Sequence, residues 1–248
     1  MSPDFTIGKP RIHFEEVDST NEVARKLIDK GEVSEGTIIT ADIQTRGRGQ
    51  FGRVWNSESS QNVLLSIILA PSFLPVVRQF DLNRAVSMAV LKTVQDYCFQ
   101  TTIKWPNDIY AGDRKIAGIL IQNFIQGRNF AHSIVGIGLN VHQKSWPPEV
   151  PNATSIALES DSEVTIDELL GKLCRQMTFY YDLLKNNDSY LNQEYVQHLF
   201  RLHQITSFTS GNNPFTGMIH GVDDLGRLQV EQNGRIEAYN HGEISMIL

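Results

Sequence analysis

The spacing of apolar and polar residues predicts strands and a helix in the first third of the chain. Residues 11–17 alternate as a strand does, and residues 19–22 (Ser-Thr-Asn-Glu) then fit a capping box that opens a helix ending at Gly31. Apolar and β-branched runs predict further strands at 36–41 and 62–69. The polar, glycine-rich residues between them, 44–60, are many for a structureless connection, which indicates a functional loop.

The rest of the chain predicts one larger and one smaller domain. Helical periodicity covers residues 76–99, and strands are predicted within 103–122 and 130–141, joined by turns that contain glycine. Apolar residues between 166 and 184 fall on one helical face, which indicates core packing. From about residue 207, short β segments with closely spaced glycines predict a small β-barrel. The chain is therefore predicted to be α+β, with a mixed sheet in a domain at 1–205 and a docked small domain at 206–248.

Composition narrows the classes of partner. The chain has 248 residues, a formal net charge of -6 and 41% hydrophobic residues, which is typical of a soluble globular protein without a nucleic-acid partner. It contains no signal peptide and no run of about 18 apolar residues, so no membrane partner and a cytoplasmic location are expected. Cys98 and Cys174 are too few for a disulfide framework and are expected in the core. Monomer and homodimer both remain open.

The glycine-rich loop is the most informative segment. Its part from Gln44 to Trp55 holds three arginines and no acidic residue in a chain that is acidic overall, which predicts a local anion site. Gly47-x-Gly49-x-x-Gly52 matches the dinucleotide fingerprint formally, but no helix follows the third glycine, which argues against a nicotinamide site. An indole on a mobile loop is unfavourable in water unless the ring can stack on, or close over, another group, so Trp55 is expected to have such a partner.

Three other segments carry candidate chemistry. Residues 104–108 read Lys-Trp-Pro-Asn-Asp, where Asn107 and Asp108 fit a plain turn as well as a ligand site. Lys115 lies at the start of a small and apolar run, where its ammonium would be less screened toward an anion than at the open surface. Two glycines in the strand at 135–141 indicate the close approach of either a ligand or another part of the chain.

Taken together and in order, these segments resemble those of biotin protein ligases: residues 19–21, 44–55, 104–108, 114–118 and 136–140. The resemblance spans nearly the whole chain. It implies a mixed sheet with flanking helices, similar to class II aminoacyl-tRNA synthetases, and a C-terminal SH3-like barrel. Some members add an N-terminal DNA-binding winged helix. Only 18 residues precede Ser19, so the monofunctional type is expected.

The resemblance also implies an activity and a set of roles. Such a ligase forms biotinyl-5'-AMP from biotin and ATP with Mg²⁺, then transfers biotin to a lysine of the biotin carboxyl carrier domain of a carboxylase. The residues implied to bind biotin are Ser19, Thr20, Asn21, Gln44, Gly47, Arg48, Gly49, Gln50, Lys115, Gly118, Ile119, Leu120 and Gly136. Those implied to bind ATP are Arg48, Arg53, Trp55, Asn107, Lys115 and Asn140. Lys115, Arg48 and Asp108 are the implied catalytic residues, and Asn107 and Asp108 are expected near Mg²⁺.

One departure and two alternatives accompany this interpretation. Gln50 stands where the family often has a second arginine, so phosphate contacts are expected to depend more on Arg46 or Arg53. A lipoate ligase or octanoyl transferase of the same superfamily normally has a histidine in this loop, but none lies between His13 and His132. A non-enzymatic regulator that binds biotin or a nucleotide is the second alternative. The presence of Arg48, Asp108 and Lys115 argues against it.

Overall fold

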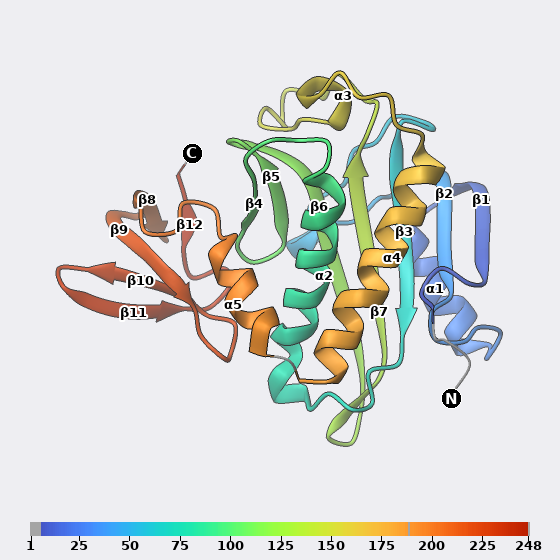
Figure 1. Ribbon diagram of the computed structural model, residues 1–248, viewed down its shortest axis with the longest axis horizontal. Helices are drawn as coiled ribbons and strands as arrows, with labels where there is room; N and C mark the ends of the chain where they lie inside the picture. The colour runs from blue at the N-terminus through green and yellow to red at the C-terminus, as the bar shows by residue number, and fades with distance from the viewer. Residues whose placement is uncertain (1–5, 188, 248) are drawn as a thin grey trace.

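The computed structural model describes residues 6–187 and 189–247, which form two β-sheets linked by helices (Figure 1). The larger sheet has seven strands in the order β1-β2-β3-β7-β6-β5-β4. Only β1 and β2 pair in parallel, and every other neighbouring pair is antiparallel. The strands are β1 (Arg11–Val17), β2 (Ile38–Gln44), β3 (Asn62–Leu69), β4 (Thr101–Lys104), β5 (Asp108–Ala111), β6 (Arg114–Gln126) and β7 (Asn129–Asn140). The mixed sheet predicted for this part of the chain is confirmed.

Helices cover both faces of this sheet. On one face α2 packs against α4, and on the other α1 contacts β2, β3 and β7 (Figure 1). Strand β3 is buried along its whole length because alternate side chains enter the two hydrophobic layers, with Ile67 in the larger and Ile68 in the smaller. The helices are α1 (Thr20–Asp29), α2 (Gln79–Val94), α3 (Ile156–Glu159), α4 (Ile166–Lys185) and α5 (Ser189–Gln197), with short 3-10 helices at Gln50–Gly52 and Val76–Arg78. No helix among the described residues is long and apolar enough to cross a membrane.

The smaller sheet is antiparallel and follows α5. Its strands are β8 (Ile205–Ser210), β9 (Asn213–Val222), β10 (Leu228–Gln232), β11 (Arg235–Tyr239) and β12 (Ser245–Met246), in the order β11-β10-β9-β8-β12. Two contacts fix the β9–β10 turn to the part of the chain that holds the larger sheet. The buried guanidinium of Arg84 donates to the carbonyl of Asp223 (2.6 Å), and Trp105 Nε1 donates to the carbonyl of Gly226 (2.9 Å). The division at 205/206 remains a prediction, and residues 1–5, 188 and 248 of the two proposed domains lie outside the described residues.

Three local expectations need correction. Helix α1 begins after Ser19 as expected, but the expected capping box is not formed: the Ser19 side chain makes no capping hydrogen bond, and Glu22 pairs with Arg48 (2.6 Å). The strand expected at 36–41 is β2 and lies two to three residues later, because Gly36 adopts a left-handed turn (φ 88°). The segment expected to be helical at 76–99 ends its regular α-helix at Val94.

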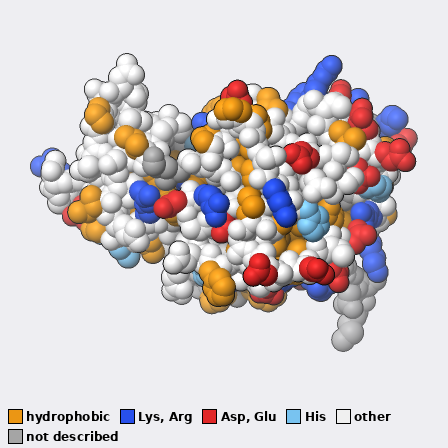
Figure 2. Space-filling view, turned by 90° about the horizontal axis from the view of Figure 1, so that it is seen from above, with side chains coloured by type: hydrophobic (Ala, Val, Ile, Leu, Met, Phe, Trp, Pro, Cys, Tyr) orange, Lys and Arg blue, Asp and Glu red, His pale blue; other side chains and the backbone are white. Residues whose placement is uncertain are grey.

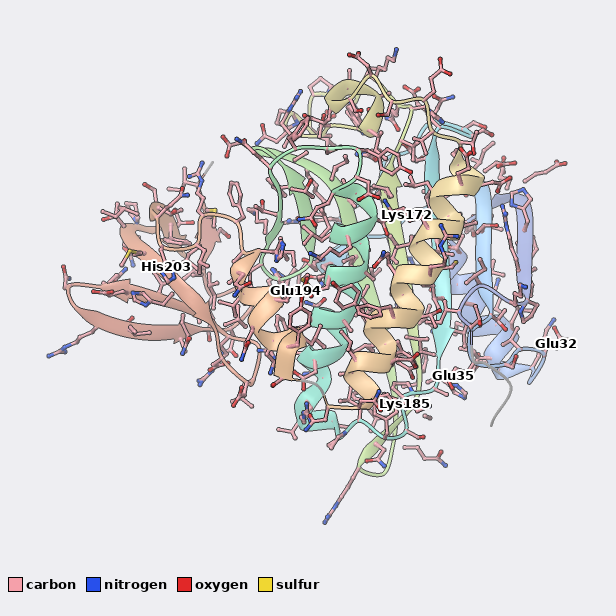
Figure 3. All side chains as sticks on the ribbon, viewed as in Figure 1. Glu32, Glu35, Lys172, Lys185, Glu194 and His203 are labelled. Carbon is pink, nitrogen blue, oxygen red and sulfur yellow. The ribbon has the colours of Figure 1, made fainter. Side chains whose placement is uncertain are left out.

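Helix α5 was not predicted, because its sequence has no strong apolar stripe. A buried carboxylate holds it instead: Glu194 lies between α5 and α2 in Figure 3 and pairs with Lys92 Nζ (2.9 Å). The same carboxylate accepts a hydrogen bond from the Tyr180 hydroxyl of α4 (2.9 Å). Burying a charge requires such partners, so α5 depends on contacts that lie far away in sequence.

The predicted core residues are confirmed. Both Cys98 and Cys174 are free and buried, and burial raises the pKa of their thiols to about 12 and about 11. The face of α4 predicted to pack inward is buried at the positions Leu169, Leu170, Leu173, Cys174, Met177, Tyr180, Tyr181 and Leu184. A capping box begins this helix, since Thr165 accepts from the backbone N–H of Glu168 and the Glu168 carboxylate reaches back.

Gly171→Ala in α4 is expected to raise the free energy of unfolding by up to about 1 kcal/mol, because alanine loses less entropy than glycine in a helix. A Cβ at Gly171 would meet only the Arg175 side chain, at 3.6 Å. Denaturant unfolding measures the change. Gly226→Ala is the contrasting variant and should lower the free energy of unfolding. Its Cβ would lie 2.3 Å from Phe80, and its φ is +85°. A loss of stability in Gly171→Ala would contradict the open space seen at this position.

Candidate active site

A cavity of about 770 Å³ lies between the larger sheet, the glycine-rich loop (residues 44–60) and the smaller sheet. It is lined by every residue that the sequence singled out for biotin, ATP or catalysis except Gly47. Gly47 lies beside it, where a Cβ would come within 2.6 Å of the Trp55 carbonyl oxygen. The fold therefore brings five separated segments to one place. The ligand that each residue contacts remains a prediction.

Polar side chains join α1, β2, β3 and β6 at one end of the cavity. Gln44 Oε1 accepts from both the backbone N–H (2.8 Å) and the hydroxyl (3.1 Å) of Thr20. The Ser66 hydroxyl lies 2.7 Å from Thr20 Oγ1 and 2.5 Å from Asn21 Oδ1, and Asn21 Nδ2 donates to Gln122 Oε1 (3.1 Å). Because these groups fix one another, they form a preorganised set of donors and acceptors. Sequence reasoning missed Ser66 and Gln122, which lie in strands with no motif to mark them.

The glycine-rich loop folds into a small hairpin. The backbone N–H of Trp55 donates to the Gly47 carbonyl (3.0 Å), and that of Gly49 donates to the Arg53 carbonyl (2.7 Å). The turn between them places Phe51 in the left-handed region (φ 53°), followed by Gly52 (φ 76°). The next regular element after the third glycine is strand β3, so an α-helix does not follow it directly as the dinucleotide fingerprint requires.

The indole of Trp55 lies against the strand glycines. A Cβ at Gly138 would come within 2.3 Å of Trp55 Cε2, and one at Gly118 within 2.9 Å of Cζ3. At Gly136 a Cβ would instead come within 2.5 Å of Asn21 Oδ1. The two glycines of β7 thus admit other side chains of the same protein. The close approach seen here is therefore a packing contact with Trp55 and Asn21, and the approach of a ligand to these glycines stays a prediction.

The loop arginines differ in where they point. Arg48 pairs with Glu22 of α1 (2.6 Å) while also lining the cavity. Arg46 is largely exposed and lies 3.8 Å from Asp18, outside the cavity, whereas Arg53 lines it. Of the two arginines considered as substitutes for the family's second loop arginine, only Arg53 is therefore placed to meet a ligand in the cavity.

Lys115 and Asp108 form an ion pair at the cavity. Lys115 Nζ lies 2.7 Å from Asp108 Oδ1 and 5.6 Å from the centre of the Trp55 ring. Asn107 is held from the other side, since its Nδ2 donates to the Ile119 carbonyl (2.6 Å). An ammonium has three donors, so Lys115 can keep Asp108 and still bind an anion. The turn between β4 and β5 therefore positions polar groups, beyond simply reversing the chain.

Several polar atoms here lack partners within the described chain. Trp55 Nε1, Asn140 Oδ1 and Gln50 Oε1 are buried, make no hydrogen bond and belong to residues that line the cavity. Asn140 is otherwise fixed, because its Nδ2 donates to the Thr154 carbonyl (2.8 Å). Buried polar atoms without partners are costly, so these three are free to bond to a polar ligand or water in the cavity.

The described residues bring too few metal-binding side chains together to enclose a metal ion. Among residues 6–187 and 189–247, no group of three histidine, cysteine, aspartate or glutamate side chains could hold a metal ion. Near the predicted Mg²⁺ position, Asp108 would offer one carboxylate and Asn107 one amide oxygen. This donor set suits Mg²⁺ that is held mainly by phosphates and water.

The sequence missed other residues of the cavity. Lys104 and Tyr110 line it, and burial lowers the pKa of Lys104 while nearby Asp108 opposes that shift. Trp146 lines it from the connection after β7, and His241 and Met246 line it from the smaller sheet. Lys104 could have been found from its place in the 104–108 motif. The others carry no local signal, because only the docking of distant segments brings them to the cavity.

Two regions of the chain are similar to known protein families. Residues 13–140 match the Biotin/lipoate A/B protein ligase family, and residues 204–246 match the biotin protein ligase C-terminal domain. The chain belongs to the biotin/lipoate A/B protein ligase family.

Relatives and solved structures within this family are similar over most of the chain. It is 29% identical to the bifunctional ligase/repressor BirA of Bacillus subtilis, over 97% of this chain and 75% of that protein. It is 28% identical to the biotin--[acetyl-CoA-carboxylase] ligase of Mycobacterium tuberculosis, over 91% of this chain and 85% of that protein. A biotin protein ligase from Aquifex aeolicus in complex with biotin and ATP superposes with a TM-score of 0.81 at 26% identity, over 96% of this chain and 99% of that one.

Proposed function

We propose that the protein is a biotin--[biotin carboxyl-carrier protein] ligase that forms biotinyl-5'-AMP from biotin and ATP, then transfers the biotinyl group to a lysine of a carrier domain. The family includes both biotin and lipoate ligases, so membership alone does not choose the acid. The relative from Mycobacterium tuberculosis is named as a biotin--[acetyl-CoA-carboxylase] ligase, and the similar Aquifex aeolicus structure is a biotin protein ligase in complex with biotin and ATP. The observation that carries the proposal is one cavity with a polar network at one end and Arg48, Arg53 and Lys115 along its wall.

The polar network suits the ureido ring of biotin. That ring has one carbonyl acceptor and two N–H donors, and it requires complementary groups that are already fixed in place. Ser19, Thr20 and Gln44 would supply these groups, while Gly118, Ile119 and Leu120 of β6 would line the wall of the pocket. Thr20 and Gln44 are held by each other (2.8 Å), so little entropy is lost when biotin binds.

Adenylation joins two anions. A carboxylate oxygen of biotin attacks the α-phosphorus of ATP, and the bond from that phosphorus to the pyrophosphate oxygen breaks. Lys115 and Arg48 would hold the carboxylate and α-phosphate together and stabilise the charge that develops, with Arg53 on the departing phosphates. Arg48 is paired with Glu22 through Nη1 in the structure, and its other guanidinium donors would be available to the substrate. Trp55 and Asn140 would contact the adenosine.

Transfer consumes the adenylate. The lysine amine of the carrier domain attacks the biotinyl carbonyl carbon, the bond to the phosphate oxygen of AMP breaks, and the amine loses a proton. Asp108 would orient that amine or accept its proton, while Lys115 stays on the phosphate of the departing AMP. Mg²⁺, placed near Asn107 and Asp108, would neutralise phosphate charge.

Mass spectrometry of the acyl adenylate tests the proposal. The protein is mixed with ATP, Mg²⁺ and either biotin or lipoate, and a biotin carboxyl carrier domain is then added. We expect biotinyl-5'-AMP, followed by one biotinyl group on the carrier, and no comparable product with lipoate. Lipoyl-AMP alone would indicate the lipoate alternative. Biotin binding without pyrophosphate release would indicate a regulator.

Limited proteolysis is expected to show that ligands order the glycine-rich loop. Trypsin cleavage after Arg46, Arg48 or Arg53 should slow when biotin and ATP are both present, because anions relieve repulsion among the arginines and fix a glycine-containing segment. The bands are followed on gels over time, with cleavage at exposed Lys185 as the internal reference. Equal loop cleavage with and without ligands would contradict a loop that closes.

A further inference from the structure

The tip of the glycine-rich loop carries an unusual residue. Phe51 is 73% exposed and has a left-handed backbone (φ 53°), which is unfavourable for an aromatic residue unless nearby contacts hold it. It lies between Arg48 and Arg53, so the position of its ring helps to determine where those arginines point. The cavity alone does not account for an aromatic side chain at this place.

The contact of Phe51 is with the smaller sheet. Its ring centre lies 4.7 Å from that of His241, with the planes tilted by 56°. A Cβ at the next residue, Gly242, would lie 3.7 Å from Phe51 Cζ, so the phenyl ring rests on the turn itself. His241 in turn meets the edge of Trp105 at 5.6 Å and 78°. Three rings therefore join three segments that are far apart in sequence.

The turn that presents His241 is preformed. Glu243 accepts at one carboxylate oxygen from the Asn240 backbone N–H (2.7 Å) and at the other from the Asn240 side-chain amide (3.1 Å). Trp105 is fixed as well, since its indole N–H donates to the carbonyl of Gly226 on the smaller sheet (2.9 Å). The loop tip thus meets a rigid surface, which reduces the entropy lost in docking.

The surroundings of His241 favour a neutral ring that packs. Desolvation lowers the pKa of His241, Arg53 and Lys104 act in the same direction, and Asp108 opposes them. An uncharged imidazole packs against a phenyl ring and does not add to the repulsion among the loop arginines. Figure 2 shows basic and acidic side chains interspersed on the face seen from above.

We propose that His241 is a positioning residue that docks Phe51 and thereby holds the glycine-rich loop closed over the nucleotide end of the cavity. The smaller sheet then takes part in adenylation through this contact. The inference rests on the proposed function, because that function makes the loop arginines phosphate ligands. His241 acts through Phe51 and makes no contact with substrate in this proposal.

Proteolysis of the ligand-free protein tests the docking contact without any activity. His241→Ala and Phe51→Ala should each speed trypsin cleavage after Arg48 and Arg53 by about twofold to tenfold, the range for the loss of one aromatic pair. The double variant should be cleaved no faster than the quicker single variant, because both remove the same contact. His241→Phe should match the wild type. Phe99→Ala is the matched control, since Phe99 is 91% exposed and outside the cavity.

Adenylation kinetics test the consequence. His241→Ala should raise KM for ATP by about twofold to tenfold with a smaller change in kcat, and His241→Phe should restore KM while His241→Gln should not. Thermal unfolding at the wild-type temperature confirms that each variant is folded. Wild-type cleavage and KM in His241→Ala would overturn the inference. A high KM in His241→Phe would also overturn it, by assigning the role to a ring nitrogen. If the wild type makes no adenylate while ligand-free cleavage behaves as described, the proposed function fails and the docking contact stands.

Discussion

Lys115→Ala is expected to slow both formation of biotinyl-5'-AMP and transfer to the carrier by a factor of roughly 10² to 10³, the usual effect of losing one preorganised charge contact in a closed site. The same ammonium is proposed to meet the biotin carboxylate in the first step and the AMP phosphate in the second. Its removal also leaves Asp108 without its 2.7 Å partner, and that carboxylate then repels the incoming anions. Single-turnover assays with isolated biotinyl-5'-AMP measure the second step separately from the first.

The control for this variant is another lysine. Lys185 lies at the C-terminal end of α4, away from the cavity (Figure 3), and Lys185→Ala should keep nearly wild-type rates because solvated charges contribute little. The fold of Lys115→Ala should persist, since Ile116 and Ile119 remain to pack. Wild-type rates in both partial reactions would show that Lys115 is not part of the active site.

Gly138→Ala is expected to lower the adenylation rate about 10²-fold, the scale of loss when a misplacement of about 1 Å disturbs a reacting geometry. The new Cβ would lie 2.3 Å from Trp55 Cε2, so the indole has to leave its place on β7 and the glycine-rich loop has to move with it. Strand β7 itself should be unaffected, because Gly138 pairs in register with Leu64 and Gly118 through its backbone.

A double-variant comparison separates this effect from a simple loss of stability. In a Trp55→Ala background, Gly138→Ala should lower the adenylation rate little further. The clashing ring is then absent, and the two changes act on one contact. Denaturant unfolding should show wild-type stability for Gly138→Ala within about 1 kcal/mol. If the two changes multiply instead, the glycine serves a ligand directly and the packing interpretation is wrong.

Much of the fold follows from the sequence because the signals are local. Strand β3 has the predicted bounds 62–69, and helix α4 buries the predicted face, since in both cases hydrophobic periodicity and burial agree. The glycines at 112 and 127 end strands where turns were expected, because both adopt positive φ. Membership in the ligase family also followed from the order of five short motifs, each of them weak alone.

Other features were decided only by contacts between segments far apart in sequence. Glu22 fits a capping box by spacing, yet its carboxylate pairs with an arginine 26 residues later, and the Ser19 side chain makes no capping hydrogen bond. The glycines of β7 signalled a close approach, but only the folded loop shows that Trp55 fills that space at Gly138. His241 reaches the cavity because the smaller sheet docks on Trp105. Neighbours in the sequence set the local propensity for helix or strand, so the sequence determined most elements of secondary structure. The partner of a side chain depends on which surfaces the packed core brings together, so only the tertiary structure decided these contacts.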